Sequence, residues 1–311
     1  MSSLKLTVVI CTHNRADLLM QAIHSLNSAV RPENCELAIM VIANACRDKS
    51  TEQLQRYRAV QQKSGTIPLQ YREEPRPGKS LALNLALKKV TDGYICFVDD
   101  DHRVDSCYLT AIAEVIRKHP DCPLFCGRII PDWTGEEPPW VHFSGQYRIY
   151  PLPVPHFELG TEAMVLDESH SIPGGGNLIV NTSLFKQIGG FNTALGPKGH
   201  NLLGSEDSDF ILRALSAKQE LRYVPSITQY HWVDIERLQL RYLLQKSYQR
   251  TRSITLTRHP EHSQPPRYLW RKLFEYSIQG LSCFSQTKGR FYMMRVAATL
   301  GEIAGYWGHT R

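Results

Sequence analysis

Short apolar runs alternate with amphipathic segments along the first hundred residues of the chain. The apolar runs have the length of strands, whereas the segments between them repeat their apolar positions every three or four residues. The predicted strands are residues 7–11, 37–43, 69–71 and 94–98, and the predicted helices are residues 16–27, residues 50–62 and a segment that starts at Pro77. Strands joined by helices in this way predict an α/β fold with a mostly parallel central sheet that has helices on both faces.

The second half of the chain departs from this alternation. Residues 133–155 are rich in Pro, Gly and aromatic residues, which predicts an ordered but irregular excursion over the edge of the sheet. Beyond Asp234 the pattern is almost wholly helical, with one interruption at residues 259–266. We therefore expect an α/β domain over residues 1–235 and a basic helical region over residues 236–311.

Positive charge is concentrated at the C-terminal end of the chain. The whole chain has 311 residues and a net charge of +6. Residues 236–311 contain 13 Lys/Arg and 4 Asp/Glu, so they carry +9 and the rest of the chain carries −3. This asymmetry favours contact with phosphate groups or with an anionic membrane surface, and a solvated basic helix face is the alternative.

Composition excludes several classes of protein. With 42% hydrophobic and 21% charged residues, the chain has the balance of an ordinary globular protein. Its eight cysteines form no CxxC pair, which favours reduced buried thiols over zinc sites or disulfides. The first apolar run indicates a strand rather than a signal peptide, and no run approaches the roughly 18 apolar residues of a membrane span. We expect a cytoplasmic protein, with a peripheral position on the inner face of the cell membrane as the alternative.

Three successive carboxylates, Asp99, Asp100 and Asp101, follow the predicted strand at residues 94–98. They lie where a strand leaves its sheet, which is the edge at which ligands bind in such folds. Like charges this close raise one another's pKa unless a cation relieves them. A Mg²⁺ site that also binds a diphosphate meets this need, because Mg²⁺ takes few protein carboxylates and completes its shell with phosphate oxygens. A solvated turn is the alternative.

A glycine and a lysine at the start of the third predicted helix suit a phosphate group. Gly78-Lys79-Ser80 matches the end of a P-loop, but the glycine required five residues earlier is replaced by Glu73, which argues against a Walker-type NTPase. Lys79 and the backbone N–H groups beside it still suit a phosphate or nucleotide, and a plain helix start is the alternative. Residues 11–15 contain no GxGxxG pattern, so NAD and FAD are disfavoured.

A second acidic cluster lies about a hundred residues after the first. Glu206, Asp207 and Asp209 occupy the predicted first turn of a helix that Ser205 caps. Capping explains one of these acids and not all three, so one carboxylate is free to act as a base towards a hydroxyl group. His231 follows a further predicted strand and is a candidate neutral nitrogen ligand for the metal, with a purely structural histidine as the alternative.

Several short motifs together resemble family 2 glycosyltransferases with a GT-A fold, over roughly residues 5 to 255. They occur in the order that is typical of that family. The motifs are residues 8–15, 44–48, 77–84 and 99–101, residues 175–177 together with 188–191, and the acidic pair 206–207. The resemblance implies a Rossmann-like GT-A domain with a C-terminal helical extension.

The resemblance also implies an inverting hexosyltransferase. The donor would be a nucleotide diphosphate sugar, and the acceptor a hydroxyl of a glycan or of a lipid-linked sugar, as in cell-surface polysaccharide synthesis. It places Asp99 near the ribose, Asp101 on Mg²⁺ or Mn²⁺, and Asp207 as the base, with Glu206 as the alternative. The residues that it implies for nucleotide binding are Thr12, Asn14, Arg15, Asn44, Lys79, Asn84, Asp99 and Asp100.

One departure from the family pattern bears on the nucleotide. The family often has Asp after the second strand to contact the base, whereas this chain has Ala43 there and Asn44 next to it. A UDP-sugar is the first expectation, and guanine and thymine nucleotides stay open. Two other classes of protein also stay open, a nucleotidyltransferase on a related fold and a non-catalytic sugar or nucleotide binder. Nucleic acid is not expected as a partner, because both acidic clusters would repel it.

The basic C-terminal region suggests two further contacts. Arg250 and Arg252 are candidates to meet the leaving diphosphate and to stabilise its developing charge. Apolar stripes within residues 238–244 and 291–300 lie beside Arg and Lys, a pattern typical of helices in an anionic membrane interface. Simple packing of the stripes against the protein is the alternative.

Overall fold

The computed structural model describes residues 3–61, 65–149, 152–195, 206–258 and 263–307. The chain divides into two compact units, residues 1–132 with 155–232, and residues 133–154 with 233–311. The aromatic segment that we expected over the sheet edge therefore belongs with the C-terminal helices, because Tyr147 packs its ring against Phe291 and Tyr292. The domain boundary between residues 235 and 236 stays a prediction.

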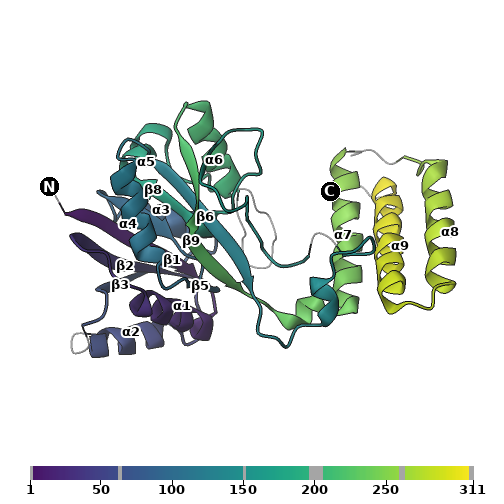
Figure 1. The fold of residues 1–311 in the computed structure, drawn as a ribbon, viewed down its shortest axis with the longest axis horizontal. Coiled ribbons are helices and arrows are strands. Elements are labelled where there is room, and N and C mark those ends of the chain that lie inside the picture. The colour runs from purple at the N-terminus through teal and green to yellow at the C-terminus, as the bar shows by residue number, and fades with distance from the viewer. Residues whose placement is uncertain (1–2, 62–64, 150–151, 196–205, 259–262, 308–311) are drawn as a thin grey trace. The chain divides into compact units, whose positions relative to one another are not determined.

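The first unit is built on one sheet, in which the described residues form nine strands (Figure 1). Its strand order is β3-β2-β1-β4-β8-β6-β9-β5, and β7 pairs with β9. Strands β1 to β4 are mutually parallel, β6 is parallel to β9, and β5, β7 and β8 run antiparallel to their neighbours. The strands are β1 (Leu4–Thr12), β2 (Cys35–Asn44), β3 (Leu69–Glu74), β4 (Tyr94–Phe97), β5 (His102–Val104), β6 (Leu124–Asp132), β7 (Met164–Leu166), β8 (Leu178–Asn181) and β9 (Leu221–Trp232). This arrangement confirms the expected α/β class with a mostly parallel sheet.

Both faces of the sheet are covered by helices. Along β1, Val8 and Ile10 belong to one buried apolar cluster and Val9 belongs to the other, as the alternation of side chains in a strand requires. Helices α1, α2 and α4 supply the first cluster, and α3, α5 and α6 supply the second. These helices are α1 (Ala16–Ser28), α2 (Ser50–Gln61), α3 (Lys79–Leu87), α4 (Tyr108–Lys118), α5 (Thr182–Ile188) and α6 (Glu206–Ser216). Each large side chain buried in this way contributes roughly 1.5–3 kcal/mol.

The parallel pairing brings three strand ends to one edge of the sheet. β1 ends at Thr12, β2 at Asn44 and β4 at Phe97, and β1 lies between the other two. The acidic residues 99–101 follow β4 directly. In a sheet of this kind the carboxyl edge beside the first strand, where the chain order reverses, is the usual ligand site.

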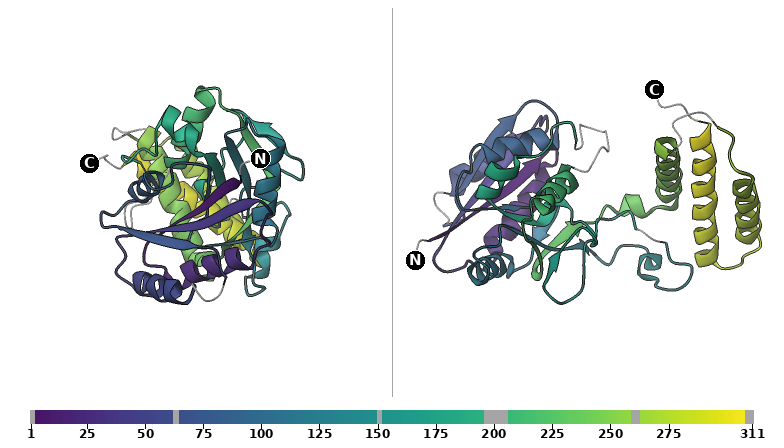
Figure 2. Two further views of the ribbon diagram at one scale, coloured as in Figure 1. Left: turned by 90° about the vertical axis from the view of Figure 1, so that its left-hand side faces the viewer. Right: turned by 90° about the horizontal axis from the view of Figure 1, so that it is seen from above.

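The described residues of the second unit form three α-helices, α7 (Leu240–Arg258), α8 (Arg267–Leu281) and α9 (Gln286–Tyr306), with α9 packed against both others (Figure 2). Gly301 and Gly305 of α9 let α7 approach closely, because a side chain at Gly301 would overlap the carbonyl oxygen of Tyr248. Thr251 donates a hydrogen bond to the carbonyl of Ala298 across the same contact, at 2.7 Å. Among the helices of the described residues, none is both long enough and apolar enough to cross a membrane.

A second close approach lies inside the sheet, where the register of β6 and β9 shifts between Cys126 and Arg128. A Cβ atom added at Gly127 would overlap the carbonyl oxygen of Ile227 and lie 2.6 Å from Nδ2 of Asn177. The shift therefore requires glycine at this position.

We expect Gly127→Ala to lower the free energy of unfolding by at least about 2 kcal/mol, because the new methyl group forces backbone apart in a packed core. Equilibrium denaturation measures the change. Gly174→Ala is the matched control, since the nearest atom to its added Cβ is Oδ2 of Asp207 at 3.9 Å. Equal effects of the two substitutions would contradict the close approach at Gly127.

Candidate active site

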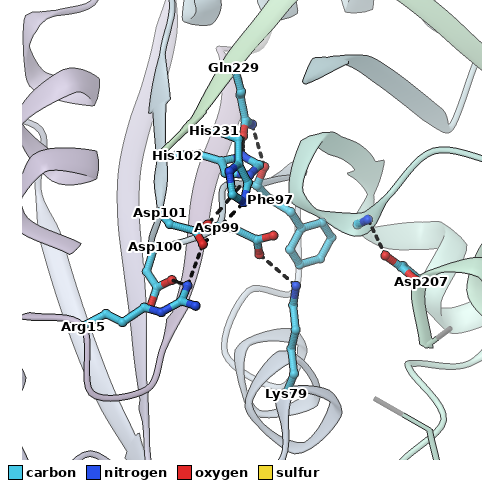
Figure 3. Close-up of polar contacts among 11 residues, drawn as sticks. Arg15, Lys79, Phe97, Asp99, Asp100, Asp101, His102, Asp207, Gln229 and His231 are labelled. Carbon is cyan, nitrogen blue, oxygen red and sulfur yellow. Dashed lines mark hydrogen bonds and ion pairs between the residues drawn. The ribbon is translucent and has the colours of Figure 1, made fainter. Parts of the chain in front are cut away.

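A cavity of about 620 Å³ opens at the carboxyl edge of the first unit and is lined by both acidic clusters. The first cluster contributes the turn after β4, and the second contributes Asp207 from the first turn of α6 (Figure 3). The lining residues that the sequence singled out are Thr12, Asn14, Arg15, Asn44, Lys79, Asp99, Asp100, Asp101, Asp207 and His231. The fold thus gathers most of the expected site residues around one hollow, although their individual roles stay predictions.

Lys79 neutralises the first carboxylate of the triplet. Its Nζ lies 2.9 Å from Oδ1 of Asp99. Burial alone would raise the pKa of Asp99, but the charge of Lys79 outweighs it and holds that pKa below its usual range. Burial opposes the charged form of Lys79, yet Asp99 and Glu206 raise the Lys79 pKa above its ordinary value. The two groups are therefore held as an ion pair.

Arg15 bridges the other two carboxylates of the triplet. Its Nη1 lies 3.0 Å from Oδ1 of Asp100 and 2.6 Å from Oδ2 of Asp101. Burial raises the pKa of Asp100 to about 6, although the guanidinium of Arg15 counteracts it. The protein itself therefore supplies part of the positive charge that the acidic triplet requires.

Two imidazoles flank Asp101. Nε2 of His231 lies 3.5 Å from its Oδ2, and Nε2 of His102 lies 3.8 Å from its Oδ1. One ligand atom from each of the three residues falls within 4.8 Å of the others, so they fit a single metal ion. Burial lowers the pKa of His231 and so favours the neutral ring that binds metals. One carboxylate and two imidazoles form a mixed oxygen and nitrogen donor set, whereas Mg²⁺ prefers an all-oxygen shell.

Sequence reasoning missed His102 as a member of this group. It lies in β5, directly opposite His231 of β9 in an antiparallel pair, so the two side chains share one face of the sheet. No local pattern reveals this pairing, because the two strands are far apart in the sequence. The only local signal was a histidine immediately after the acidic triplet.

Asp207 and Glu206 lie in different surroundings. Oδ2 of Asp207 accepts a hydrogen bond from the backbone N–H of Gly175 at 2.5 Å, which fixes the carboxylate at the cavity wall. Glu206 is 4% exposed, and burial raises its pKa. Asp207 is therefore the acid of the pair that lines this cavity. The expected N-cap, Ser205, lies outside the described residues.

The side chains of two asparagines that we expected to contact the nucleotide are hydrogen-bonded to backbone groups instead. The side-chain amide of Asn44 donates to the carbonyls of Glu74 and Arg76 and accepts from the N–H of Gly78, which fixes the turn into α3. Both polar atoms of Asn84 bond the backbone of Phe191. Nucleotide contacts of these two side chains stay predictions.

The other expected contacts lie in three different settings. Oδ1 of Asn14 accepts from the N–H of Arg47 at 2.7 Å, and Thr12 is 2% exposed at the end of β1. Arg250 and Arg252 are exposed on α7, in the other compact unit, so their role towards a diphosphate stays a prediction.

Comparison with known proteins identifies one family model and one curated relative. Residues 7–189 match the model described as glycosyl transferase family 2. A glucosyl-dolichyl phosphate glucuronosyltransferase of Haloferax volcanii is 22% identical over 215 residues. The match covers 68% of this chain and 63% of that protein, so the chain spans less than two thirds of the length of this relative.

Solved structures with the same fold are also glycosyltransferases. S. aureus TarS 1-349 in complex with UDP-GlcNAc is 15% identical, with a TM-score of 0.56, over 97% of this chain and 90% of that one. The mannosyltransferase PcManGT from Pyrobaculum calidifontis, in complex with GDP-Man and Mn²⁺, is 14% identical, with a TM-score of 0.56, over 96% and 85%. At these identities the likeness shows the fold alone, and it confirms the expected GT-A fold.

We expect Asn44→Leu to lower the free energy of unfolding by about 3 kcal/mol, because it removes the three hydrogen bonds that the Asn44 side chain makes to the backbone of Glu74, Arg76 and Gly78. Denaturation in urea measures the change. Asn192→Ala serves as the control, since Asn192 is exposed and accepts one local bond from Ala194. A loss at Asn44 no larger than that at Asn192 would contradict the structural role of Asn44.

Proposed function

The chain belongs to glycosyl transferase family 2, and on that premise we propose that it is an inverting, metal-dependent glycosyltransferase. The donor is a nucleotide diphosphate sugar, and the acceptor is a hydroxyl of a glycan or of a lipid-linked sugar. One observation carries the proposal: a single cavity is lined by the acidic cluster 99–101 and by a separate carboxylate, that of Asp207.

The chemistry follows from the charges around the cavity. Asp207 takes the proton of the acceptor hydroxyl, whose oxygen bonds to the anomeric carbon as the bond from that carbon to the diphosphate oxygen breaks. Lys79 and Arg15 keep positive charge beside the leaving diphosphate. Asp101 with His231 would hold the divalent cation, which would add further positive charge there.

The nucleotide is the less constrained part of the donor. Ala43 has no polar side chain for a base, and the Asn44 side chain is bonded to backbone, so neither selects uracil. We place UDP-sugars first and test GDP- and dTDP-sugars beside them. TarS was solved with UDP-GlcNAc and PcManGT with GDP-Man, so both nucleotides occur within this fold.

A panel of nucleotide sugars with Mn²⁺ tests the reaction, and slow release of nucleoside diphosphate is the expected result. Asp207→Asn should lower transfer about 10²- to 10⁴-fold and leave donor affinity unchanged, because it removes the base and keeps the shape. Asp209→Asn is the matched control in the same turn, where Asp209 pairs with Arg213.

Three outcomes contradict parts of this proposal. Full activity of Asp207→Asn together with an inactive Glu206→Gln protein would make Glu206 the base. Release of pyrophosphate instead of nucleoside diphosphate would indicate a nucleotidyltransferase. Donor binding without any turnover would indicate a non-catalytic binder.

We infer that the C-terminal region contacts an anionic membrane surface through α8 rather than through the stripes that the sequence indicated. Leu238 and Leu243 are buried, at 1% and 2% exposure, and Phe291 packs against Tyr147. One face of α8 is instead apolar and solvent-exposed. Its residues are Trp270 at 47%, Phe274 at 67%, Ile278 at 48% and Leu281 at 89% exposure.

Charge complementarity favours a membrane as the partner of this face. Arg267, Arg271 and Lys272 lie on the same helix, in the region that carries a net charge of +9. Bulky apolar residues beside cations bind the headgroup region of anionic bilayers. A lipid-linked acceptor would be reached from such a position.

We expect the protein to float with vesicles that contain phosphatidylglycerol, and high salt should weaken this binding. Phe274→Glu should lower vesicle affinity at least about tenfold, since burial of a Phe side chain contributes roughly 1.5–3 kcal/mol. Val60→Glu on α2 is the control, because Val60 is exposed to a similar degree, at 58%. Failure to bind at low salt, or a concentration-dependent dimer that Phe274→Glu abolishes, would overturn the membrane contact.

A further inference from the structure

A buried polar network lies directly behind the proposed metal site. Its centre is Gln229 of β9, which is fully buried, at 0% exposure. Nδ1 of His102 lies 2.5 Å from Oε1 of Gln229. Nε2 of Gln229 lies 3.0 Å from the carbonyl oxygen of Phe97 (Figure 3). It also lies 2.8 Å from Oη of Tyr108 and 3.0 Å from Oδ1 of Asn177.

The orientation of each amide in this network follows from its neighbours. Nδ2 of Asn177 lies 2.8 Å from the carbonyl oxygen of Arg128 and 3.0 Å from that of Ile227. Carbonyl oxygens only accept hydrogen bonds, so this end of Asn177 must be the NH₂ group and Oδ1 must be an acceptor. That oxygen and the Phe97 carbonyl in turn require the NH₂ group of Gln229 on their side.

The same logic sets the tautomer of His102. With its NH₂ group turned towards Asn177 and Phe97, Gln229 presents an oxygen to the imidazole, and an oxygen of this kind accepts only. Nδ1 of His102 therefore carries the proton. In the neutral ring the lone pair is then on Nε2, the atom that lies 3.8 Å from Oδ1 of Asp101.

We propose that Gln229, oriented by Asn177, is a positioning residue that holds His102 in the Nδ1-protonated form and presents its Nε2 as a third ligand, beside Asp101 and His231, for a divalent cation such as Mn²⁺. The proposal rests on the proposed function, because the metal is that of the same site. Partners of this kind fix ring orientation at metal centres, and their loss typically lowers metal affinity 10- to 100-fold.

Close packing around the His102 ring is consistent with this positioning of His102. A Cβ atom added at Gly176 would lie 2.9 Å from Cε1 of His102 and 2.6 Å from Oδ2 of Asp99, so the backbone of the glycine run closes directly on the imidazole. The ring is itself 3% exposed. Packing therefore keeps the ring in place while Gln229 selects which nitrogen faces Asp101.

Binding of Mn²⁺ alone, followed by the electron paramagnetic resonance signal of free Mn²⁺, tests the proposal without any nucleotide sugar. Gln229→Leu should weaken Mn²⁺ binding about 10- to 100-fold. Gln229→Glu keeps an acceptor for Nδ1 and should restore most of the affinity, although it loses the donor towards Phe97 and Asn177.

Tyr108→Phe is the matched control. It removes a hydroxyl from the same network but does not touch His102, so it should lower thermal stability and leave Mn²⁺ affinity within about twofold of wild type. A purely structural network would instead lower affinity in step with stability in all three variants, and that result would overturn the proposal.

A measurement on the unaltered protein covers the case in which Gln229→Leu does not fold. Long-range ¹H–¹⁵N spectra of the metal-free protein should report the Nδ1-protonated tautomer of His102, and an Nε2-protonated ring would overturn the assignment. If sugar transfer is absent but the Mn²⁺ series behaves as expected, only the proposed function fails. If transfer occurs and Gln229→Leu binds Mn²⁺ like wild type, only the positioning role fails.

Discussion

Repulsion among three adjacent carboxylates is the constraint on which the carboxyl edge of this protein depends. Lys79 neutralises Asp99, and Arg15 lies between the other two. Asp100 is the most deeply buried of the three, and burial raises its pKa to about 6, so its protonation relieves part of the repulsion only as the pH falls towards that value. The carboxylate that still needs a cation is that of Asp101. Arg15 contacts Asp101 on one side, and on the other side Asp101 and the two imidazoles could hold a metal ion. The cluster is therefore able to fold with side-chain cations alone and still attract a further cation.

The parts of this arrangement that could be predicted from the sequence are those that depend on local pattern. Apolar runs of strand length mark β1, β2 and β4, and parallel pairing places their carboxyl ends together whatever the details of packing. That is why Asp101, at the end of β4, and Lys79, at the start of α3, lie at one cavity as expected. Asp207 could also be predicted from local pattern, because the first turn of α6 contains three acidic residues and helix capping explains only one of them.

The parts that escaped prediction depend on pairing between distant segments. In the sequence Gln229 is an ordinary polar residue. Its contact with His102 follows only from the pairing of β9 with β5 and β6. From the sequence we expected Asn44 to contact a nucleotide. In the fold its side chain is instead hydrogen-bonded to the backbone of Glu74 and Gly78. The exposed apolar face lies on α8 for a similar reason, because packing buries Leu238 and Leu243 and places Phe291 against Tyr147.

The glycine run 174–176 links the two halves of the site. On one side, a Cβ atom at Gly176 would lie 2.6 Å from Oδ2 of Asp99, and on the other, a Cβ atom at Gly175 would lie 2.9 Å from Cβ of Asp207. Backbone without side chains therefore separates the cation-binding cluster from the proposed base and contacts both. The N–H of Gly175 also bonds the carboxylate of Asp207, so the same residue sets the distance of that carboxylate and its direction. A side chain at Gly175 would displace Asp207, and one at Gly176 would displace Asp99 or His102. The spacing between the acidic cluster and Asp207 is thus determined by backbone, which is the least deformable part of the site.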